Sequence, residues 1–202
     1  MNKKVILFLN GEEPLLYPNL EQYDKVYCTD GSYHYLIQNN IFPDVISGDF
    51  DSLELKVTNH NTTVIPTPDQ DFTDFEKALK IIVDHGYLAV DVYGGSGKQQ
   101  DHFIGNLNAA CKFKEHLNIQ FFDNYSSYYF AEKQTVLHLP VGKTVSLLPF
   151  PICKGITTEG LLYPLQNEDL SLTDRIGTRN VTNDTTVKIN FESGELILFI
   201  LD

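Results

Sequence analysis

Several residue types and segment types are rare or missing in this 202-residue sequence. It contains no Trp, one Met and three cysteines, Cys28, Cys111 and Cys153, with no CxxC pair among them. An odd number of widely spaced cysteines is typical of buried, inert thiols in a reducing compartment. No apolar run approaches the length of a membrane span, and the run at 5–9 is too short for a signal-peptide core. We therefore expect a cytoplasmic protein with no membrane partner.

Positive charge is also scarce. The chain has 15 Lys and Arg residues against 27 Asp and Glu residues, which gives a formal net charge of −12. A surface of this sign argues against binding to nucleic acid or to an anionic membrane. An anionic substrate would need a metal ion or a local group of cations to bind.

Short apolar runs alternate with helical patterns in the first part of the chain. Strands are expected at 5–9, 25–28, 45–46, 64–65, 88–93 and 119–122. Helices are expected over 33–40, from Asp71 onwards and through Cys111. This alternation predicts an α/β domain with an open, mostly parallel sheet and flanking helices. Ligands of such sheets bind at the carboxyl ends of the strands, where Asp30 and Gly31 follow the second run. A helix-capping role for Asp30 is equally open.

Carboxylates are concentrated between residues 48 and 77. Asp49 and Asp51 are two apart in an extended segment, so both side chains can face one target. Asp71 and Asp74 are three apart, which makes them neighbours on a helix. Carboxylates that converge in this way repel one another unless a hard cation such as Mg²⁺ lies between them and a phosphate. The sequence therefore predicts a magnesium site, although it lacks the loop pattern of an EF-hand.

Structural roles for the second acidic group are also open. Thr73 and Glu76 form the sequence pattern of a capping box, and Asp71 would favour the positive end of a helix dipole. Asp69 and Asp71 are also compatible with solvated turn positions. Lys77 is either a salt-bridged surface lysine or a cation that contacts phosphate.

A glycine-rich loop, Gly94-Gly95-Ser96-Gly97-Lys98, joins the fifth expected strand to the next helix. Backbone N–H groups in such a loop can bind phosphate oxygens. The spacing fits neither a P-loop nor GxGxxG, and the loop is also compatible with a simple tight turn. Asp101 is expected as the N-cap of the following helix, and His102 alone is compatible with a structural role.

The pattern changes after Asn124. Strands are expected at 135–139, 145–148, 187–190 and 195–201, with a hairpin turn at 192–194. These predict an all-β module of roughly 70 residues, which is small for a self-sufficient core. We expect it to pack on the first domain, on a second subunit, or on both.

Taken together, these segments resemble the thiamine pyrophosphokinase family. The resemblance covers most of the chain and depends on the order of its motifs. The strongest are Asp30-Gly31, Pro43-Asp44 with Gly48-Asp49-Phe50-Asp51-Ser52, Asp69-Gln70-Asp71 with Thr73-Asp74-Phe75 and Lys77-Ala78-Leu79, and Gly94-Gly95-x-Gly97 with Asp101-His102 and Asn106. Weaker C-terminal matches are Gly160-Leu161-x-Tyr163-Pro164-Leu165 and Gly177-Thr178-x-Asn180.

The resemblance implies a fold, a reaction and an assembly. The fold is an α/β catalytic domain over 1–130 followed by a thiamine-binding β-sandwich over 131–202. The reaction transfers the pyrophosphoryl group of ATP to the thiamine hydroxyl and leaves AMP. The assembly is a homodimer with thiamine near the subunit interface.

The resemblance also implies roles for residues. Mg²⁺ and the triphosphate would be held by Asp49, Asp51, Asp74 and Asp101. ATP would contact Asp30, Gly31, Lys77, Gly94, Gly95, Gly97, Lys98, Asp101 and His102. Thiamine would contact Gln70, Thr178, Arg179 and Asn180. The attacking hydroxyl needs a base, and the carboxylate of Asp71 or Asp74 is a candidate.

The sequence departs from the family pattern at several positions. Gln99 replaces the usual Arg, and Lys98 beside it supplies a point charge but no guanidinium fork. Leu162 and Arg179 replace the Lys and Ser often found there, and the Trp on which some relatives stack thiamine is absent. Two alternatives remain: a metal-dependent phosphohydrolase that uses the same carboxylates on water, and a non-catalytic thiamine- or nucleotide-sensing module.

Overall fold

The computed structural model describes residues 3–50 and 61–201, and it divides into two compact units. The first unit comprises residues 1–124 and the second comprises residues 125–202. Strand β7 (Ser126–Phe130) therefore groups with the second unit, although it precedes the boundary expected at residue 130. Among the described residues, no helix combines the length and the apolar character that a membrane crossing requires.

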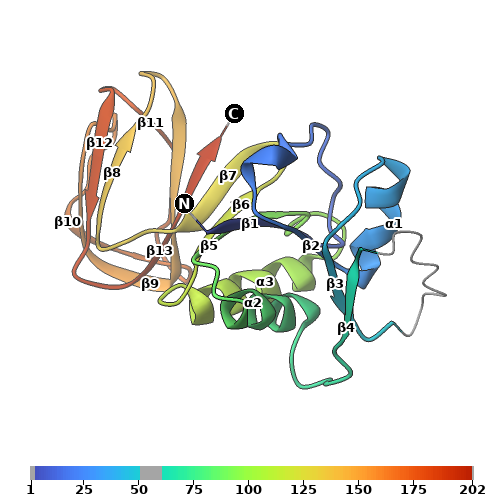
Figure 1. Ribbon diagram of the computed structural model, residues 1–202. Helices are drawn as coiled ribbons and strands as arrows, with labels where there is room; N and C mark the ends of the chain where they lie inside the picture. Colours follow the sequence, from blue (N-terminus) through green and yellow to red (C-terminus); the bar gives the residue numbers. More distant parts are fainter. Residues whose placement is uncertain (1–2, 51–60, 202) are drawn as a thin grey trace. The chain divides into compact units, whose positions relative to one another are not determined.

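The first unit contains an open parallel sheet (Figure 1). Its described strands follow the spatial order β4-β3-β2-β1-β5-β6, and every neighbouring pair is parallel. The strands are β1 (Lys4–Phe8), β2 (Val26–Thr29), β3 (Val45–Gly48), β4 (Thr63–Pro66), β5 (Ala89–Tyr93) and β6 (Asn118–Phe122). The expected α/β class is confirmed.

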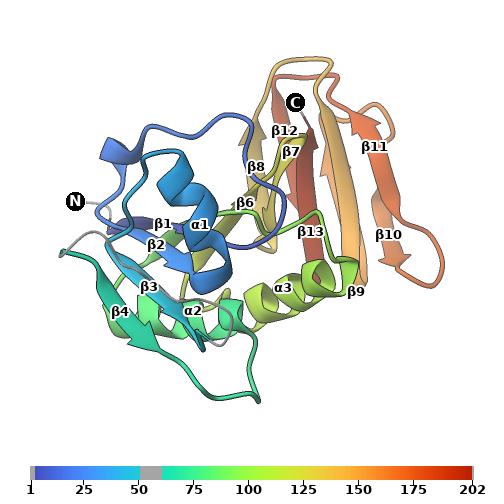
Figure 2. The ribbon, with the colours of Figure 1, turned by 90° about the vertical axis from the view of Figure 1, so that its right-hand side faces the viewer.

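Helices cover both faces of this sheet, which explains why its central strands are apolar without alternation. Helix α1 (Asp30–Gln38) lies on one face, where Leu36 packs with Ile6 and Phe8. Helices α2 (Asp74–Asp84) and α3 (Gln100–Phe113) lie on the other face (Figures 1 and 2). There Phe75 of α2 packs against Phe121 of β6, with ring centroids 5.7 Å apart.

The strand order creates a switch point between β1 and β5. From β1 the chain proceeds outwards to β2, β3 and β4, and it then returns to the other side of β1 to form β5 and β6. At such a switch point an open α/β sheet has a crevice at the carboxyl ends of its strands. Open α/β sheets bind their ligands in this crevice.

The second unit consists of strands around one apolar core. The strands are β7 (Ser126–Phe130), β8 (Gln134–His138), β9 (Thr144–Glu159), β10 (Gln166–Ser171), β11 (Gly177–Val181), β12 (Thr186–Asn190) and β13 (Ser193–Leu201). The long strand β9 pairs with β10, β11, β12 and β13, all antiparallel. Buried side chains from several strands, such as Leu147, Ile156, Val187 and Leu198, form the core. This is the strand-rich C-terminal domain that the sequence predicts.

Four local expectations were wrong. Helix α1 begins at Asp30, so the residues expected as a turn form its first turn. Helix α2 begins at Asp74, so Asp71 precedes it, and Phe72 is half exposed. The N-cap of α3 is Gln99, because Asp101 already lies in its first turn. Residues 192–194 form no hairpin, since β12 and β13 pair with β9 and not with each other.

Candidate functional site

A cleft of about 800 Å³ lies at the carboxyl ends of the parallel strands of the first unit. It is formed by the segments that follow β1, β2, β3, β4 and β5 together with the starts of α1, α2 and α3. Thirteen of the residues predicted to form the site line it: Asp30, Gly31, Asp49, Gln70, Asp71, Asp74, Lys77, Gly94, Gly95, Gly97, Lys98, Asp101 and His102. The predicted ligand Asp51 lies outside the described residues.

Asp30 supports the loop that carries Asp49. Its carboxylate accepts hydrogen bonds from the N–H groups of Gly31 (2.7 Å) and Phe50 (3.1 Å). Gly48 makes room for this carboxylate, because a Cβ at Gly48 would stand 2.3 Å from the Asp30 Cγ. Asp30 thus ties the start of α1 to the loop that follows β3. Asp30 is not the cap of α1, because the N-cap is Thr29 and Asp30 is the first residue of the helix.

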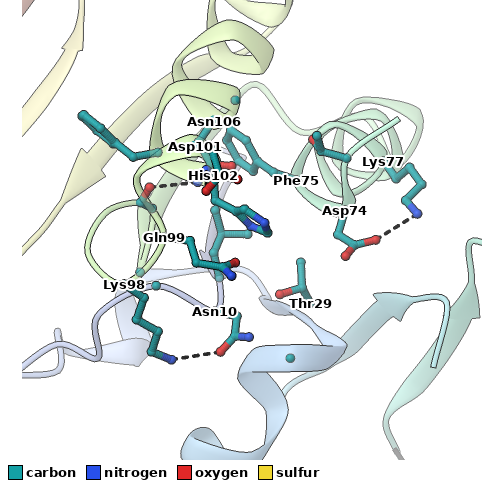
Figure 3. Close-up of a pocket in the computed structure, with 18 of the residues that line it drawn as sticks. Asn10, Thr29, Asp74, Phe75, Lys77, Lys98, Gln99, Asp101, His102 and Asn106 are labelled. Carbon is teal, nitrogen blue, oxygen red and sulfur yellow. Dashed lines mark hydrogen bonds and ion pairs between the residues drawn. The ribbon is translucent and has the colours of Figure 1, made fainter. Parts of the chain in front are cut away.

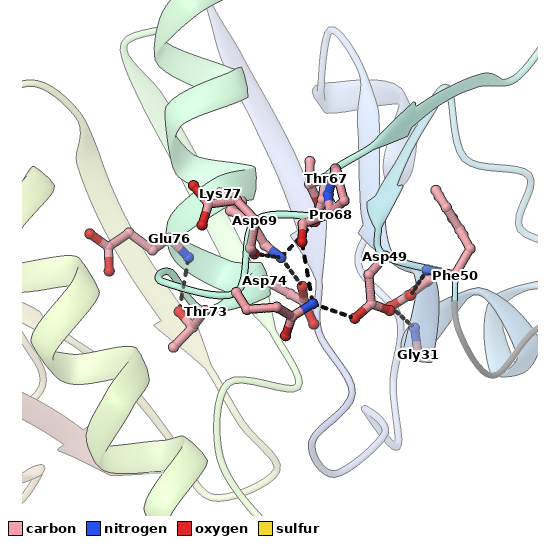
Figure 4. A network of polar contacts seen from close by, with 12 residues as sticks. Gly31, Asp49, Phe50, Thr67, Pro68, Asp69, Thr73, Asp74, Glu76 and Lys77 are labelled. Atoms are coloured by element: carbon pink, nitrogen blue, oxygen red, sulfur yellow. Dashed lines mark hydrogen bonds and ion pairs between the residues drawn. The ribbon is translucent and has the colours of Figure 1, made fainter.

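A second loop, residues 67–73, brings Gln70 and Asp71 to the cleft. The Gln70 Nε2 donates to the Asp49 Oδ2 at 3.2 Å, so this loop reaches the loop after β3 (Figure 4). The Asp71 N–H donates to the Asp69 Oδ1 at 2.9 Å, which closes a turn. This turn therefore positions Asp71, which lies before the helix in which it was expected.

Helix α2 starts directly after this loop. Its N-cap is Thr73, whose hydroxyl accepts from the Glu76 N–H at 3.2 Å. The side chain of Glu76 pairs with Lys112 of α3 at 3.1 Å, so only one half of the expected capping box is formed. Asp74, the first residue of α2, pairs with Lys77 one turn later at 2.9 Å.

The glycine-rich loop after β5 packs against the segment after β1. Gly11 donates to the Gly94 carbonyl and Glu12 donates to the Ser96 carbonyl, both at 2.8 Å. Gly94 adopts a φ of 69°, and a Cβ there would stand 2.3 Å from the Leu9 carbonyl oxygen. Close backbone packing and positive φ therefore require glycine here. The loop remains suited to phosphate, since it lines the cleft ahead of the N-terminus of α3.

Polar side chains close the remaining wall of the cleft. The Lys98 Nζ donates to the Asn10 Oδ1 at 3.0 Å, and the Asn106 Nδ2 donates to the Gly95 carbonyl at 2.8 Å (Figure 3). Asp101 accepts from the His102 N–H at 3.0 Å. Asn10 also lies over Gly31, where a Cβ would stand 2.7 Å from its Nδ2.

The sequence did not identify Asn10, Thr29, Phe75 or Phe103 as site residues, yet all four line the cleft. Asn10 precedes Gly11, and a dipeptide of this kind by itself indicates only a turn. A usable signal existed, because Asn10 follows the first buried strand and so stands at the carboxyl edge of the sheet.

The cleft is acidic. Burial raises the pKa of Asp30 above its ordinary value, and the carboxylates of Asp74 and Asp49 raise it further, while the N–H groups of Phe50 and Gly31 act in the opposite direction. The Asp74 and Asp49 carboxylates are thus close enough to repel the Asp30 carboxylate. A divalent cation would relieve this repulsion.

The donor set fits a hard cation shared with a substrate. Among residues 3–50 and 61–201, no three His, Cys, Asp or Glu side chains are arranged as a ready metal site. Mg²⁺ is normally held by one or two carboxylates together with substrate phosphates and water, and not by an all-protein cage. Carboxylate oxygens that line a cleft of about 800 Å³, which has room for such a substrate, meet that requirement.

The predicted thiamine contacts Thr178, Arg179 and Asn180 lie on β11 of the second unit. Thr178 and Arg179 are exposed, whereas Asn180 is buried. The Asn180 side chain accepts from the Tyr163 N–H (3.1 Å) and donates to the Tyr163 carbonyl (2.7 Å). Asn180 therefore fixes the backbone that presents Tyr163, whose own side chain is 65% exposed.

Comparisons with known proteins agree on one family. Residues 18–121 match the family described as thiamin pyrophosphokinase, catalytic domain, and residues 132–196 match thiamin pyrophosphokinase, vitamin B1 binding domain. The chain is 25% identical to thiamin pyrophosphokinase 1 of Caenorhabditis elegans, over 98% of this chain and 88% of the relative. It is 24% identical to the thiamine pyrophosphokinase of Bacillus subtilis strain 168, over 96% and 97%. The crystal structure of thiamin pyrophosphokinase from Geobacillus thermodenitrificans has the same fold, with a TM-score of 0.82, 24% identity and coverage of 98% and 97%.

Proposed function

This chain belongs to the thiamin pyrophosphokinase family, and on that premise we propose that it transfers the pyrophosphoryl group of ATP to the hydroxyl of thiamine. The products are thiamine pyrophosphate and AMP. One observation carries the proposal: carboxylates from separate loops and a glycine-rich loop line a single cleft at the switch point of the sheet. This arrangement suits a metal–nucleotide complex and an alcohol that attacks it.

Asp49, Asp74 and Asp101 are the proposed ligands of Mg²⁺, together with Asp51. All three described carboxylates line the cleft from different segments. The metal supplies charge neutralisation on the triphosphate oxygens, which lowers the barrier to attack at the β-phosphorus. We assign the binding of the same oxygens to the N–H groups of the glycine loop and to the N-terminus of α3.

The protein has two further tasks in this reaction. It must orient the thiamine hydroxyl in line with the β-phosphorus, and it must take the hydroxyl proton. We assign the proton to Asp71, because Asp74 is already committed to the Lys77 ammonium at 2.9 Å. We assign a thiamine contact to Gln70, whose side chain donates a hydrogen bond to Asp49.

The second unit is proposed to complete the thiamine pocket in a homodimer. Leu162 and Tyr163 are 52% and 65% exposed next to Asn180, and a second subunit or a ligand would cover them. Light scattering after size exclusion measures the mass of the assembly, and a dimer of twice 22.9 kDa is expected.

A cytoplasmic location is proposed from the cysteine content.

Labelled ATP tests the reaction. With thiamine and Mg²⁺, both a β-³²P and a γ-³²P label should appear in thiamine pyrophosphate, with one AMP formed for each product. Asp101→Asn should abolish both products, whereas Asp84→Asn, at an exposed site far along α2, should not. Release of labelled phosphate with unchanged thiamine would indicate a phosphohydrolase, and binding without turnover would indicate a sensor.

A further inference from the structure

The ammonium group of Lys77 is enclosed by three acceptors. Its Nζ lies 2.9 Å from the Thr67 carbonyl oxygen, 3.0 Å from the Asp69 carbonyl oxygen and 2.9 Å from the Asp74 Oδ1 (Figure 4). The side chain is only 10% exposed. A lysine ammonium has three N–H donors, so all of its donors are used by the protein itself.

These acceptors belong to two segments, a loop and a helix, whose position relative to each other matters for the proposed reaction. The carbonyls of Thr67 and Asp69 belong to the loop that brings Gln70 and Asp71 to the cleft, while Asp74 is the first residue of α2. The loop is further tied to β3, because the Thr67 N–H donates to the Gly48 carbonyl at 2.8 Å. Lys77 therefore joins the loop to the helix at the point where both line the cleft.

We propose that Lys77 is a positioning residue that holds the 67–73 loop and the Asp74 carboxylate in place, and that it does not bind the substrate phosphate. A phosphate oxygen would have to displace one of these three acceptors, because the ammonium has no fourth N–H donor to offer. The proposal rests on the proposed function, because it assigns Lys77 a part in presenting Asp71 and Asp74 for that reaction.

The geometry also explains why lysine is required. The three acceptors converge on one point, and a tetrahedral ammonium directs its donors to three separate acceptors. A guanidinium is planar and longer, and its donors suit a fork-shaped partner. Arginine would keep the positive charge but would not reproduce the three contacts.

Two substitutions and a matched control test the proposal. Lys77→Met removes the ammonium and keeps the length of the side chain, and Lys77→Arg keeps the charge alone. Lys80→Met is the control, since Lys80 lies on the same helix, is 69% exposed and pairs only with Asp84 in the described interactions. Each variant is examined by steady-state kinetics and, without any ligand, by hydrogen exchange of the peptide that covers residues 67–73.

The expected results separate positioning from phosphate binding. Lys77→Met should lower kcat by about 100-fold, the scale expected when a catalytic group is displaced by about 1 Å, with KM for ATP changed by no more than about threefold. Exchange of the 67–73 peptide should become about tenfold faster without ligand. Lys77→Arg should lower kcat by at least about tenfold despite its charge, and Lys80→Met should match the wild type in both readouts.

Two results would overturn the proposal. The first is a KM for ATP that rises at least about tenfold while kcat and ligand-free exchange stay unchanged, because that is the signature of a lost phosphate contact. The second is a Lys77→Arg variant with wild-type kinetics. If Lys77→Met does not fold, Lys77→Arg carries the test alone. A wild-type protein that makes no thiamine pyrophosphate would reject the proposed function, and the exchange measurement would still decide whether Lys77 holds the loop.

Discussion

Replacing Gly11 by alanine adds only one methyl group, yet it should disrupt one wall of the cleft. The segment after β1 and the glycine loop after β5 meet there, backbone against backbone. An alanine Cβ would stand 2.2 Å from the carbonyl oxygens of both Gly94 and Ser96, whereas contacts under 3.0 Å are essentially never found. Neither oxygen belongs to a flexible side chain, so the two segments must separate.

The structure gives the size of the effect. Separation breaks the hydrogen bonds from Gly11 to Gly94 and from Glu12 to Ser96, both 2.8 Å. Two such bonds contribute about 2 kcal/mol, and overpacking adds about 1–3 kcal/mol. We expect Gly11→Ala to lower the free energy of unfolding by about 3–5 kcal/mol. Activity should fall as well, because the displaced loop is the proposed phosphate-binding loop.

Guanidinium unfolding followed by circular dichroism measures this change. Gly105→Ala is the matched control, because Gly105 lies inside α3 and a Cβ there meets nothing within 4 Å. Replacing a helix glycine by alanine should raise stability by about 0.5–1 kcal/mol. If Gly11→Ala unfolds at the same denaturant concentration as the wild type, the close packing of these two segments is not as described.

Three further predictions follow from the structure, of which two concern substitutions and one concerns thiol labelling. Thr73→Ala removes the N-cap of α2 and should cost about 1 kcal/mol of stability, while Thr73→Ser should retain it; equal melting temperatures for both variants would contradict the capping contact. Asn180→Ala removes both hydrogen bonds to the Tyr163 backbone and should cost about 2 kcal/mol, a loss measured by chemical denaturation and refuted by an unchanged midpoint. Burial raises the pKa of the Cys153 thiol to about 12 and raises the pKa of the Cys28 thiol as well. At pH 8 both thiols therefore remain protonated, and they should react with a thiol reagent only after unfolding. Rapid labelling of either thiol in the folded protein would refute their burial.

Much of the first unit follows from local sequence. The buried runs around Ile6, Cys28 and Val90 are apolar because helices cover both faces of the sheet, and such runs are recognisable without a structure. The order of the strands in the sheet depends on pairing between distant segments, so local sequence did not predict the switch point between β1 and β5. Asn10 was missed for another reason, since its place shortly after the first buried strand was not used as a sign of the carboxyl edge of the sheet.

Where prediction failed, tertiary contacts decided the outcome. The start of α1 contains Asp, Gly and Ser, which are typical of a turn. The Ser32 hydroxyl donates to the carbonyls of Phe8 and Thr29 at 2.8 and 2.7 Å, and this anchors the helix start to β1. Strands β10 and β11 were not predicted, because their polar composition does not favour strands. Their pairing with β9 stabilises them as strands in the fold.

The acidic residues show what the order of motifs along the sequence can predict. This order identified Asp49, Asp71, Asp74 and Asp101, and the fold brings all four to one cleft. It did not reveal that Asp30 braces the Asp49 loop or that Lys77 is fully occupied by three acceptors. Such distinctions depend on distances between segments that are far apart in the chain.

The central claim is that carboxylates from separate loops bind a divalent cation beside a nucleotide triphosphate. The most direct measurement is a crystal structure of the full chain with Mn²⁺, a non-hydrolysable ATP analogue and thiamine, with the metal located by its anomalous signal. We expect metal density in the cleft, bonded to oxygens of Asp49, Asp74 or Asp101 and to the analogue's phosphates. Metal and triphosphate bound away from these carboxylates would contradict the account.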